Sequence, residues 1–324
     1  MQSPVTVAIP TLNAGAAFAQ TLAAVRDQQL KGEVQLLVCD SGSSDGTVAL
    51  ARSYHGDVIE IPRESFSHGG TRNLLMSRAR GAHVAFLTQD AVPASNDWLA
   101  SLLAAFALAA DVGLAFGPYR PAPDASLPVA RELTAWFASF SDGGPRIDVL
   151  DPAQRTGPAR DFLGHLGFFT DANGCVARAA WEQVPFRTIA YAEDHLLAQD
   201  MLRAGFAKVY VPGAAVIHSH EYSPWQWLRR SFDETRAVRE VYGRAHSGSV
   251  RDAARNLRGN VGADLRWAHE GRGPGDRPAR PRRLVAAATS ILHHSARTTG
   301  ALLGAHSEHL PSRLVAELSL ERRR

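Results

Sequence analysis

The chain has 324 residues, of which 45% are apolar and 21% are charged. This length suits one large α/β domain with an appendage, or two domains, and the composition excludes a disordered or fibrous chain. Two distant cysteines, Cys39 and Cys175, form neither a disulfide framework nor a zinc cluster, which suits a reducing cytosol. No secretory signal opens the chain, so we expect a cytoplasmic protein.

Charge is unevenly distributed along the chain. Residues 1–243 carry 20 Lys and Arg against 25 Asp and Glu, a net charge of −5, whereas residues 244–324 carry 15 against 7, a net charge of +8. The basic C-terminal region has three interpretations: a solvated helical cap, an interface in a homo-oligomer, or a surface for anionic lipids at the inner face of the plasma membrane. Nucleic acid is not an expected partner, because no DNA- or RNA-binding motif accompanies the charge.

Short apolar runs alternate with helical patterns over the first 118 residues. The patterns predict strands at 5–10, 35–40, 58–61, 83–88 and 112–117, and helices at 16–29, 47–54, 71–80 and 96–110. Such alternation predicts parallel strands with helices on both faces of the sheet. Ligands of such sheets bind beyond the carboxyl ends of the strands, which makes Pro10–Asn13, Asp40–Ser44 and Gln89–Asp90 candidate site residues.

The rest of the chain is less regular. Residues 119–165 are rich in Pro and Gly and resemble an inserted or crossover region. Further on, the patterns predict helices at 179–184, 194–204 and 224–241, short strands at 208–211 and 215–218, and Arg-rich helices from 244 with a break at 271–281.

Two glycine-containing segments could contact a ligand. Asp40 precedes "SGSSDGT", where a carboxylate and main-chain N–H groups suit a base, a ribose or an anion, although a capping turn has the same composition. The segment Phe66–Asn73, "FSHGGTRN", places His68 and Gly69 before a predicted helix start. Glycine there permits close approach of the backbone to a ligand, and Arg72 could meet a phosphate.

Two acidic segments could contribute catalytic groups. Asp90 in "LTQDA" could bind a divalent cation together with a diphosphate, or could serve as a turn residue. Glu193 and Asp194 in "YAEDHLLAQD" are favourable neighbours of a helix dipole. In the catalytic interpretation, Asp194 is a general base that takes a proton from a hydroxyl nucleophile.

The segment "VIHSHEYS" carries His218 and His220 on one face of a predicted strand. Either imidazole could complete the coordination of a metal held by Asp90, although histidine pairs also occur at ordinary surfaces and in cores. In "PWQWLRR", which follows, Trp225 could stack on a sugar and Arg229 and Arg230 could face phosphate; the alternative for the tryptophan is a core position.

Taken together, "VAIPTLNAG", "VCDSGSSDGT", "FSHGGTRN", "LTQDAVP", "YAEDHLLAQDMLRAGF" and "VIHSHEYS" resemble the family 2 glycosyltransferases, and within them the rhamnosyltransferase branch. The resemblance covers about residues 4–243. It implies a GT-A fold, an α/β mixed sheet flanked by helices, with residues 1–118 as the nucleotide-binding half, 119–243 as the acceptor half and 244–324 as a basic helical extension.

The resemblance also implies roles for individual residues. The donor would be dTDP-L-rhamnose, the cofactor Mg²⁺ or Mn²⁺, and the acceptor a glycan or lipid-linked saccharide in cell-surface polysaccharide synthesis. Asp194 would be the catalytic base, Asp90 and His218 the metal ligands. The residues expected at the donor are Pro10, Leu12, Asp40, Arg72, Gln89 and Asp90. Weaker expectations for substrate contact are His68, Gly69, Glu193, His220, Trp225, Arg229 and Arg230.

The sequence departs from the family pattern at two positions. Thr88 stands where the family has the first acid of an Asp-x-Asp element, and Leu12 replaces an aromatic residue. The alternatives are a UDP-hexose donor or a non-catalytic nucleotide-sugar-binding scaffold protein. A dinucleotide dehydrogenase is disfavoured because no G-x-G-x-x-G follows the first strand.

Overall fold

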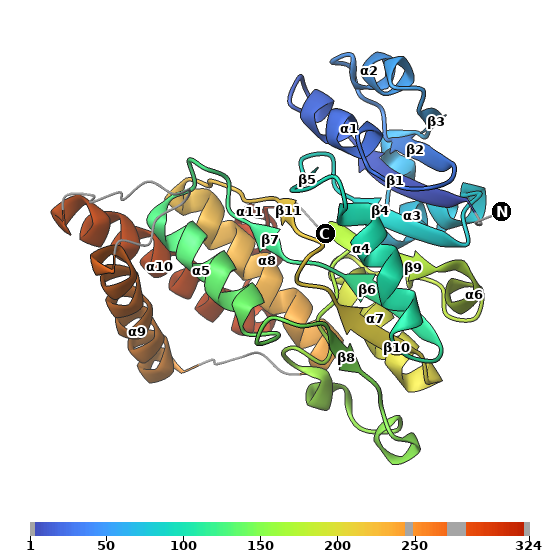
Figure 1. Cartoon of the computed structure of the whole chain (residues 1–324). Coiled ribbons are helices and arrows are strands. Elements are labelled where there is room, and N and C mark those ends of the chain that lie inside the picture. Colours follow the sequence, from blue (N-terminus) through green and yellow to red (C-terminus); the bar gives the residue numbers. More distant parts are fainter. Residues whose placement is uncertain (1–3, 244–248, 271–282, 321–324) are drawn as a thin grey trace. The chain divides into compact units, whose positions relative to one another are not determined.

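The computed structural model describes residues 4–243, 249–270 and 283–320, which divide into two compact units (Figure 1). The first unit comprises Met1–Arg120 and Phe137–His218, and the second comprises Pro121–Trp136 and Ser219–Arg324. These units are defined by packing and not by activity, so the functional division that was predicted at residue 243 stays a prediction.

The first unit contains a large sheet, a small sheet and the helices that cover them. Its strands are β1 Val5–Thr11, β2 Val34–Asp40, β3 Asp57–Glu60, β4 His83–Leu87, β5 Val92–Pro93, β6 Val112–Phe116, β7 Tyr119–Arg120, β8 Arg146–Asp148, β9 Asn173–Ala177, β10 Ala207–Tyr210 and β11 Val216–Ile217. Its helices are α1 Phe18–Arg26, α2 Thr47–Ser53, α3 His68–Arg78, α4 Trp98–Ala104, α6 Arg178–Trp181 and α7 Glu193–Ala204.

The large sheet has eight strands in the order β3-β2-β1-β4-β9-β6-β10-β8. Strands β3, β2, β1 and β4 are parallel, as are β6 and β10. Strand β9 runs antiparallel between β4 and β6, and β8 is an antiparallel edge strand. The small sheet has the order β5-β11-β7. This mixed sheet flanked by helices confirms the predicted fold class.

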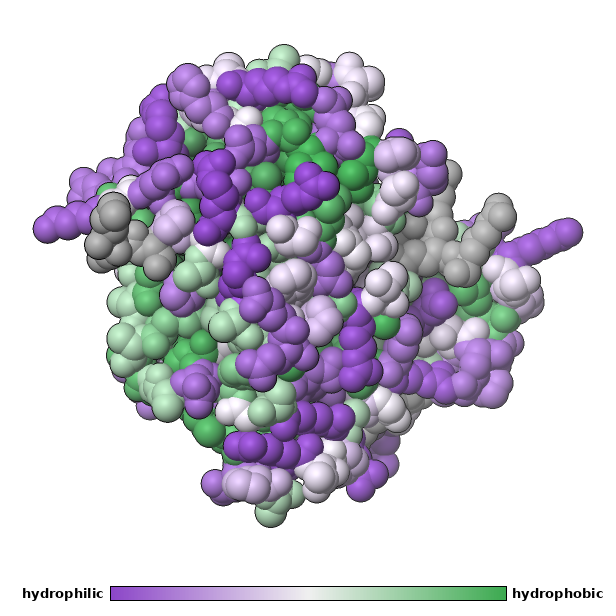
Figure 2. All heavy atoms as spheres, turned by 90° about the vertical axis from the view of Figure 1, so that its right-hand side faces the viewer, coloured by the Kyte–Doolittle hydropathy of each residue, from purple (hydrophilic) through white to green (hydrophobic). Residues whose placement is uncertain are grey.

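The apolar core of the first unit lies on both faces of its sheet. Val5, Val7 and Ile9 alternate along β1 and pack toward Phe18 of α1 and Trp98 of α4. Helices α3 and α7 pack against each other and against strands of the same sheet. On the face drawn in Figure 2, hydrophilic residues predominate and hydrophobic ones form smaller patches. This face therefore carries no large continuous apolar surface.

Several elements differ from the sequence prediction. Strand β9 was not predicted because its first two residues belong to "DANG", which has the composition of a turn. Helix α5, Leu127–Ala138, occupies part of the region predicted to be irregular, and its first residues belong to the second unit. The predicted helix at 71–80 spans His68–Arg78 in the structure. The two glycines that were predicted to precede the helix lie inside its first turn.

A buried lysine fixes the chain just before β9. The ammonium of Lys208 donates to the carbonyls of His165 at 2.8 Å, Leu166 at 2.7 Å and Phe168 at 2.7 Å, and lies 3.2 Å from the carboxylate of Asp148. Its side chain is fully buried, and this burial lowers the pKa of Lys208 to about 8, against the opposing effect of Asp148. The fixed segment leads directly into the acidic site described below.

The second unit is helical. It contains α8 Pro224–Tyr242, α9 Val250–His269, α10 Arg283–Ala305 and α11 Ser312–Leu318, together with most of α5. Asp264 of α9 is fully buried and accepts hydrogen bonds from Ser290 at 2.6 Å and from Arg131. The Nε2 atom of His294 lies 2.8 Å from Oδ2 of the same carboxylate. None of the helices in the described part of the chain combines the length and the apolar character needed to cross a bilayer.

Helix α3 holds the segment that precedes α7. The Asn73 side chain donates to the Phe186 carbonyl at 2.8 Å and accepts from the Phe186 N–H at 3.0 Å and from Trp181 Nε1 at 2.8 Å. A Cβ atom at Gly69 would overlap the main-chain carbonyl of Arg187. The first glycine of the "HGG" motif therefore allows close approach of the protein's own backbone.

We predict that Gly69→Ala destabilises the fold, because the Arg187 carbonyl is main chain and cannot rotate away. The expected loss is about 1–3 kcal/mol, the usual cost of overpacking. Gly70→Ala is the matched control, since its Cβ would meet only the movable hydroxyl of Ser67. Alanine there gains helix propensity. Chemical denaturation of both variants tests the prediction, and equal stability of the two would contradict it.

Candidate active site

The Asp40 carboxylate organises the loop that follows β2. It accepts hydrogen bonds from Thr11 Oγ1 at 2.8 Å, from the Gly42 N–H at 3.1 Å, and from the Ser43 N–H at 2.8 Å and Oγ at 2.6 Å. Asp40 is 1% exposed. Its role in this structure is to fix the turn beside the first strand, and its contact with a nucleoside stays a prediction.

The ends of β1 and β4 are joined by a side chain that was predicted to contact the donor. Gln89 Oε1 accepts from the Leu12 N–H at 2.9 Å, and Gln89 Nε2 donates to the Leu12 carbonyl at 3.3 Å. Pro10, the other residue predicted to line the nucleoside pocket, is half-buried on the same strand. This clamp fixes the main chain immediately before Asp90, so that the Asp90 side chain projects from a rigid position.

Asp90 and His218 meet within the first unit. The Nδ1 atom of His218 lies 3.6 Å from Oδ1 of Asp90, and their side chains are 10% and 46% exposed. A carboxylate and an imidazole are suitable ligands for Mn²⁺ or Mg²⁺, and the exposure of Asp90 leaves room for further oxygen ligands. These two residues therefore fit a divalent cation. His220 belongs to the second unit, and its role stays a prediction.

Tyr119 connects the Asp90 side of the site with a second acidic cluster. Its ring packs edge-on against His218 at 4.9 Å, and its hydroxyl is hydrogen-bonded to Thr170, next to Asp171. Burial raises the pKa of Tyr119, and the nearby carboxylates of Asp194, Asp171 and Asp90 raise it further, against the lowering effect of the Thr170 hydrogen bond. Tyr119 is therefore neutral at physiological pH.

Arg72 of α3 lies at the centre of the second cluster. Its guanidinium forms a two-pronged ion pair with Asp171, with Nη2 2.7 Å from Oδ1, and lies 3.1 Å from Glu193 Oε1. Arg72, Asp171 and Glu193 are 3%, 5% and 4% exposed. The guanidinium thus ties the start of β9 to the start of α7. Its predicted contact with a diphosphate stays a prediction.

The cluster contains more acidic groups than cations. Burial raises the pKa of Asp171 to about 7; Arg72 opposes this, and the neighbouring Glu193 adds to it. Burial likewise raises the pKa of Glu193, with Arg72 again opposing and Asp194 contributing. One guanidinium cannot neutralise three carboxylates, so the cluster retains a proton near neutral pH.

Asp194 occupies the first turn of α7. The preceding Ala192 has a left-handed backbone, with φ at 63°, a conformation that non-glycine residues rarely adopt and that is concentrated at functional sites. Burial and the Asp171 carboxylate raise the pKa of Asp194 to about 7, while Arg72 and the main-chain N–H of His195 oppose them. Asp194 is only partly buried. It can therefore reach a substrate and exchange a proton near neutral pH.

The remaining predicted residues fall into two groups. His68 lies beside the acidic cluster, with Nδ1 3.7 Å from Glu193 Oε1, and Gly69 packs on the protein's own backbone. His220, Trp225, Arg229 and Arg230 belong to the second unit. Their contacts with a substrate of the first unit stay predictions.

Sequence reasoning missed Asp171, Thr170 and Tyr119. Asp171 lies between an apolar pair and the "NG" turn signal, which made it resemble a loop residue. Its partner Arg72 is 99 residues away, and no local pattern reports that distance. The sequence did offer one signal, an acid close to the apolar pair Phe168–Phe169. Burial of a carboxylate without a partner is costly, so an acid in such a place indicates a distant cationic partner.

A comparison with known protein families matches residues 6–158 to the family Glycosyl transferase family 2. Among curated proteins, the chain is 32% identical over 234 residues to the O-antigen chain rhamnosyltransferase RfbN of Salmonella typhimurium, covering 71% of this chain and 70% of that protein. It is 30% identical over 236 residues to the O-antigen chain rhamnosyltransferase WbaN of Salmonella anatum, covering 70% of each.

Solved structures show the same fold at lower identity. The mannosyltransferase PcManGT from Pyrobaculum calidifontis, in complex with GDP-Man and Mn²⁺, matches with a TM-score of 0.57 at 19% identity, covering 95% of this chain and 87% of that one. Residues 1–349 of TarS from S. aureus match with a TM-score of 0.54 at 13% identity, covering 97% and 93%. Together with the family match and the curated relatives, this likeness confirms the family resemblance seen in the sequence: the chain is a member of glycosyltransferase family 2.

Proposed function

We propose that the protein transfers L-rhamnose from dTDP-L-rhamnose, with inversion, to a hydroxyl of a glycan or lipid-linked saccharide in cell-surface polysaccharide synthesis. Two O-antigen rhamnosyltransferases at about one-third identity support the choice of sugar. The observation that carries the mechanism is Asp194, a partly buried carboxyl group with a pKa of about 7 at the start of α7.

In the proposed reaction, Asp194 takes the proton of the acceptor hydroxyl as its oxygen attacks the anomeric carbon. A new carbon–oxygen bond forms on one face of the sugar while the bond to the nucleoside diphosphate breaks on the other, which inverts the configuration. A base whose pKa lies near the working pH suits this proton transfer. Arg72 and Asp171 hold Glu193, the residue before the base, in place.

Asp90 and His218 are the residues that would hold a divalent cation. When bound, such a cation would neutralise negative charge on the leaving diphosphate. PcManGT, which shares the fold, was solved with Mn²⁺ and GDP-Man, and this supports the assignment by analogy. The absence of a second acid at Thr88 makes His218 the more important partner of Asp90.

The predicted location in the cytoplasm, with membrane contact through residues 244–324, stays a prediction. Leu284, Val285, Ile291 and Leu292 of α10 are exposed apolar residues that fit such a contact. A solvated helical cap and an interface in a homo-oligomer are the other two interpretations of the same region.

We predict that Asp194→Asn lowers turnover by about 10²–10⁴-fold, the usual contribution of a positioned base. Binding of dTDP should persist, because the amide has the size of the carboxyl group. Asp200→Asn, on the same helix but paired with Arg187 at 2.7 Å, is the control. A radiolabelled transfer assay measures both variants. Near-full activity of Asp194→Asn would remove the base assignment, and transfer by the wild type would exclude a non-catalytic scaffold.

We predict that activity falls as pH drops below about 7, because Asp194 must be ionised to accept a proton. In Asp171→Asn, a neighbouring negative charge disappears while Arg72 remains, so the pKa of Asp194 falls and the acidic limb of the kcat/KM profile moves to lower pH. Asp200→Asn should leave the limb in place. An acidic limb whose apparent pKa is unchanged or higher in Asp171→Asn would contradict this prediction. If turnover of the variant is too slow to measure, NMR titration of the carboxyl groups measures the pKa of Asp194 directly.

We predict that dTDP raises the melting temperature more than UDP does, in the presence of Mn²⁺. Asp90→Ala should remove the part of the shift that depends on Mn²⁺, because one of two protein ligands is lost. Glu182→Ala, which removes an exposed acid just after α6 and outside the predicted site segments, is the control. A larger shift with UDP would favour a UDP-hexose donor, and an unchanged shift in Asp90→Ala would exclude Asp90 as a ligand.

A further inference from the structure

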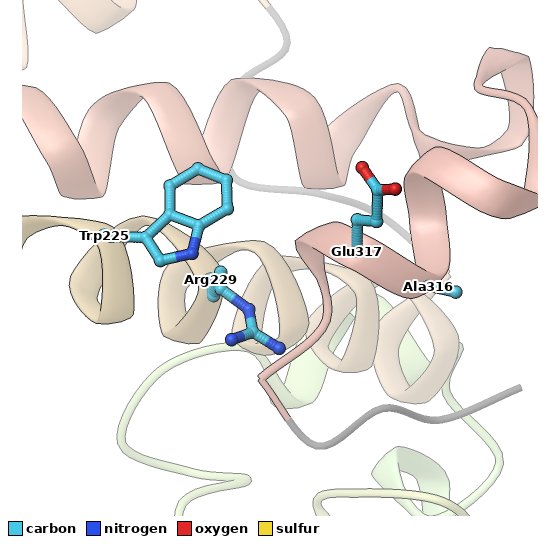
Figure 3. A pocket seen from close by; sticks show the side chains of 4 residues that line it. All are labelled: Trp225, Arg229, Ala316 and Glu317. Atoms are coloured by element: carbon cyan, nitrogen blue, oxygen red, sulfur yellow. The ribbon is translucent and has the colours of Figure 1, made fainter.

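A groove in the second unit lies between the first turns of α8 and the short helix α11. It has a volume of about 440 Å³ and is lined by Trp225, Arg229, Ala316 and Glu317. Figure 3 shows the Trp225 indole and the Glu317 carboxylate on either side of the gap, with the Arg229 guanidinium between them. Small-molecule sites have volumes of roughly 300–1,000 Å³, so the groove has room for a small ligand.

Trp225 is an exposed aromatic residue at a fixed position beside the groove. Ser223 caps α8 and accepts from the Gln226 N–H, and Pro224 begins the helix, so the position of Trp225 is fixed. Its side chain is 54% exposed. Within the part of the chain that the structure describes, its indole makes no hydrogen bond or ring contact. Trp227, by contrast, packs edge-on against His293 at 4.7 Å.

The two charged residues of the groove are not paired with each other. One nitrogen of Arg229 donates to the Ser319 carbonyl, whereas its Nε is buried and has no hydrogen-bond partner among the described residues. Glu317 is exposed and forms no ion pair or hydrogen bond within the same residues. Arg229 therefore keeps donor groups that its contacts with the described residues do not use.

We propose that this groove binds one pyranose unit of a saccharide chain, at a site that does not include Asp194. The C–H face of a pyranose is apolar and would cover the exposed indole. Hydroxyl groups at the ring edge can both accept a hydrogen bond from Arg229 and donate one to Glu317. A flat apolar platform flanked by one donor and one acceptor therefore matches the surface of a sugar.

The charge of the groove selects against other ligands. A nucleotide, a free phosphate or an anionic lipid headgroup would be attracted by Arg229 but repelled by Glu317, which lines the same groove. A purely apolar chain would leave both charged groups without partners. A neutral, polyhydroxylated ring satisfies all three side chains, which is the reason for choosing a saccharide.

This choice of saccharide rests on the proposed function, since the acceptor of the transfer is itself a saccharide chain. A second contact with the acceptor would raise its effective concentration at the enzyme. The expected effect is a lower KM for long acceptors, with kcat unchanged. Short acceptors, which cannot occupy both sites, should show no effect.

The test uses saturation-transfer NMR on the full chain with methyl α-L-rhamnopyranoside and with a rhamnose-containing oligosaccharide. Trp225→Ala should weaken binding by about tenfold, and Trp225→Phe should retain part of it because an aromatic face remains. Glu317→Ala should also weaken binding. Leu292→Ala is the matched control, since Leu292 is 56% exposed on α10 outside the groove.

Equal saturation transfer in the wild type and Trp225→Ala would overturn the proposal. A shift of Trp225 fluorescence with anionic vesicles but not with sugars would overturn it in favour of a lipid surface. The dTDP thermal shift is measured on the same samples and should be unchanged in Trp225→Ala. If the sugar binds at Trp225 but dTDP causes no thermal shift, the groove proposal stands and the proposed dTDP-linked donor is contradicted. If dTDP causes a shift but the sugar does not bind at Trp225, the donor proposal stands and the groove proposal is contradicted.

Discussion

The arrangement of the candidate active site depends on one buried guanidinium. Arg72 is almost inaccessible to water and is surrounded by carboxyl groups from the start of β9 and the start of α7. A buried cation without partners would be very costly, so the chain must bring Asp171 and Glu193 to it in order to fold. The same requirement places Asp194, the next residue after Glu193, at a fixed position. The stability of the fold and the position of the proposed base therefore depend on the same ion pairs.

This arrangement also explains why the candidate base holds its proton so tightly. A single carboxylate beside an arginine has a lowered pKa, because the cation stabilises the charged form. Here Arg72 pairs with Asp171 and Glu193. Burial therefore raises the pKa of Asp194 by more than the positive charge of Arg72 lowers it. A cluster with one cation for three carboxyl groups therefore gives Asp194 a pKa near neutrality, whereas a balanced cluster would leave it permanently ionised.

The residues at strand ends were predictable from the sequence, because the rule for parallel sheets relates strand ends to binding sites. That rule singled out Asp90, and the family resemblance assigned roles to Asp194 and His218; these roles stay predictions. The partners of these residues were not predictable in the same way. Asp171 precedes a strand that runs antiparallel in the middle of the sheet, and its local sequence resembles a turn. Gly69 shows the opposite error, since glycine signals a close approach but not whether the approaching group is a ligand or the chain itself.

The basic C-terminal region illustrates how far net charge can be interpreted. Ion pairs inside the second unit link this region to residues outside it in both directions. Arg297 pairs with Glu132 of α5, whereas Glu308 pairs with Arg239 of α8 and the buried Asp264 pairs with Arg131. Because both arginines and acids of residues 244–324 take part in these pairs, the net charge counted along the sequence does not say which side chains are available to an external anion. A binding site in this unit requires side chains that the protein's own contacts leave available. The groove lined by Trp225, Arg229 and Glu317 brings such side chains together.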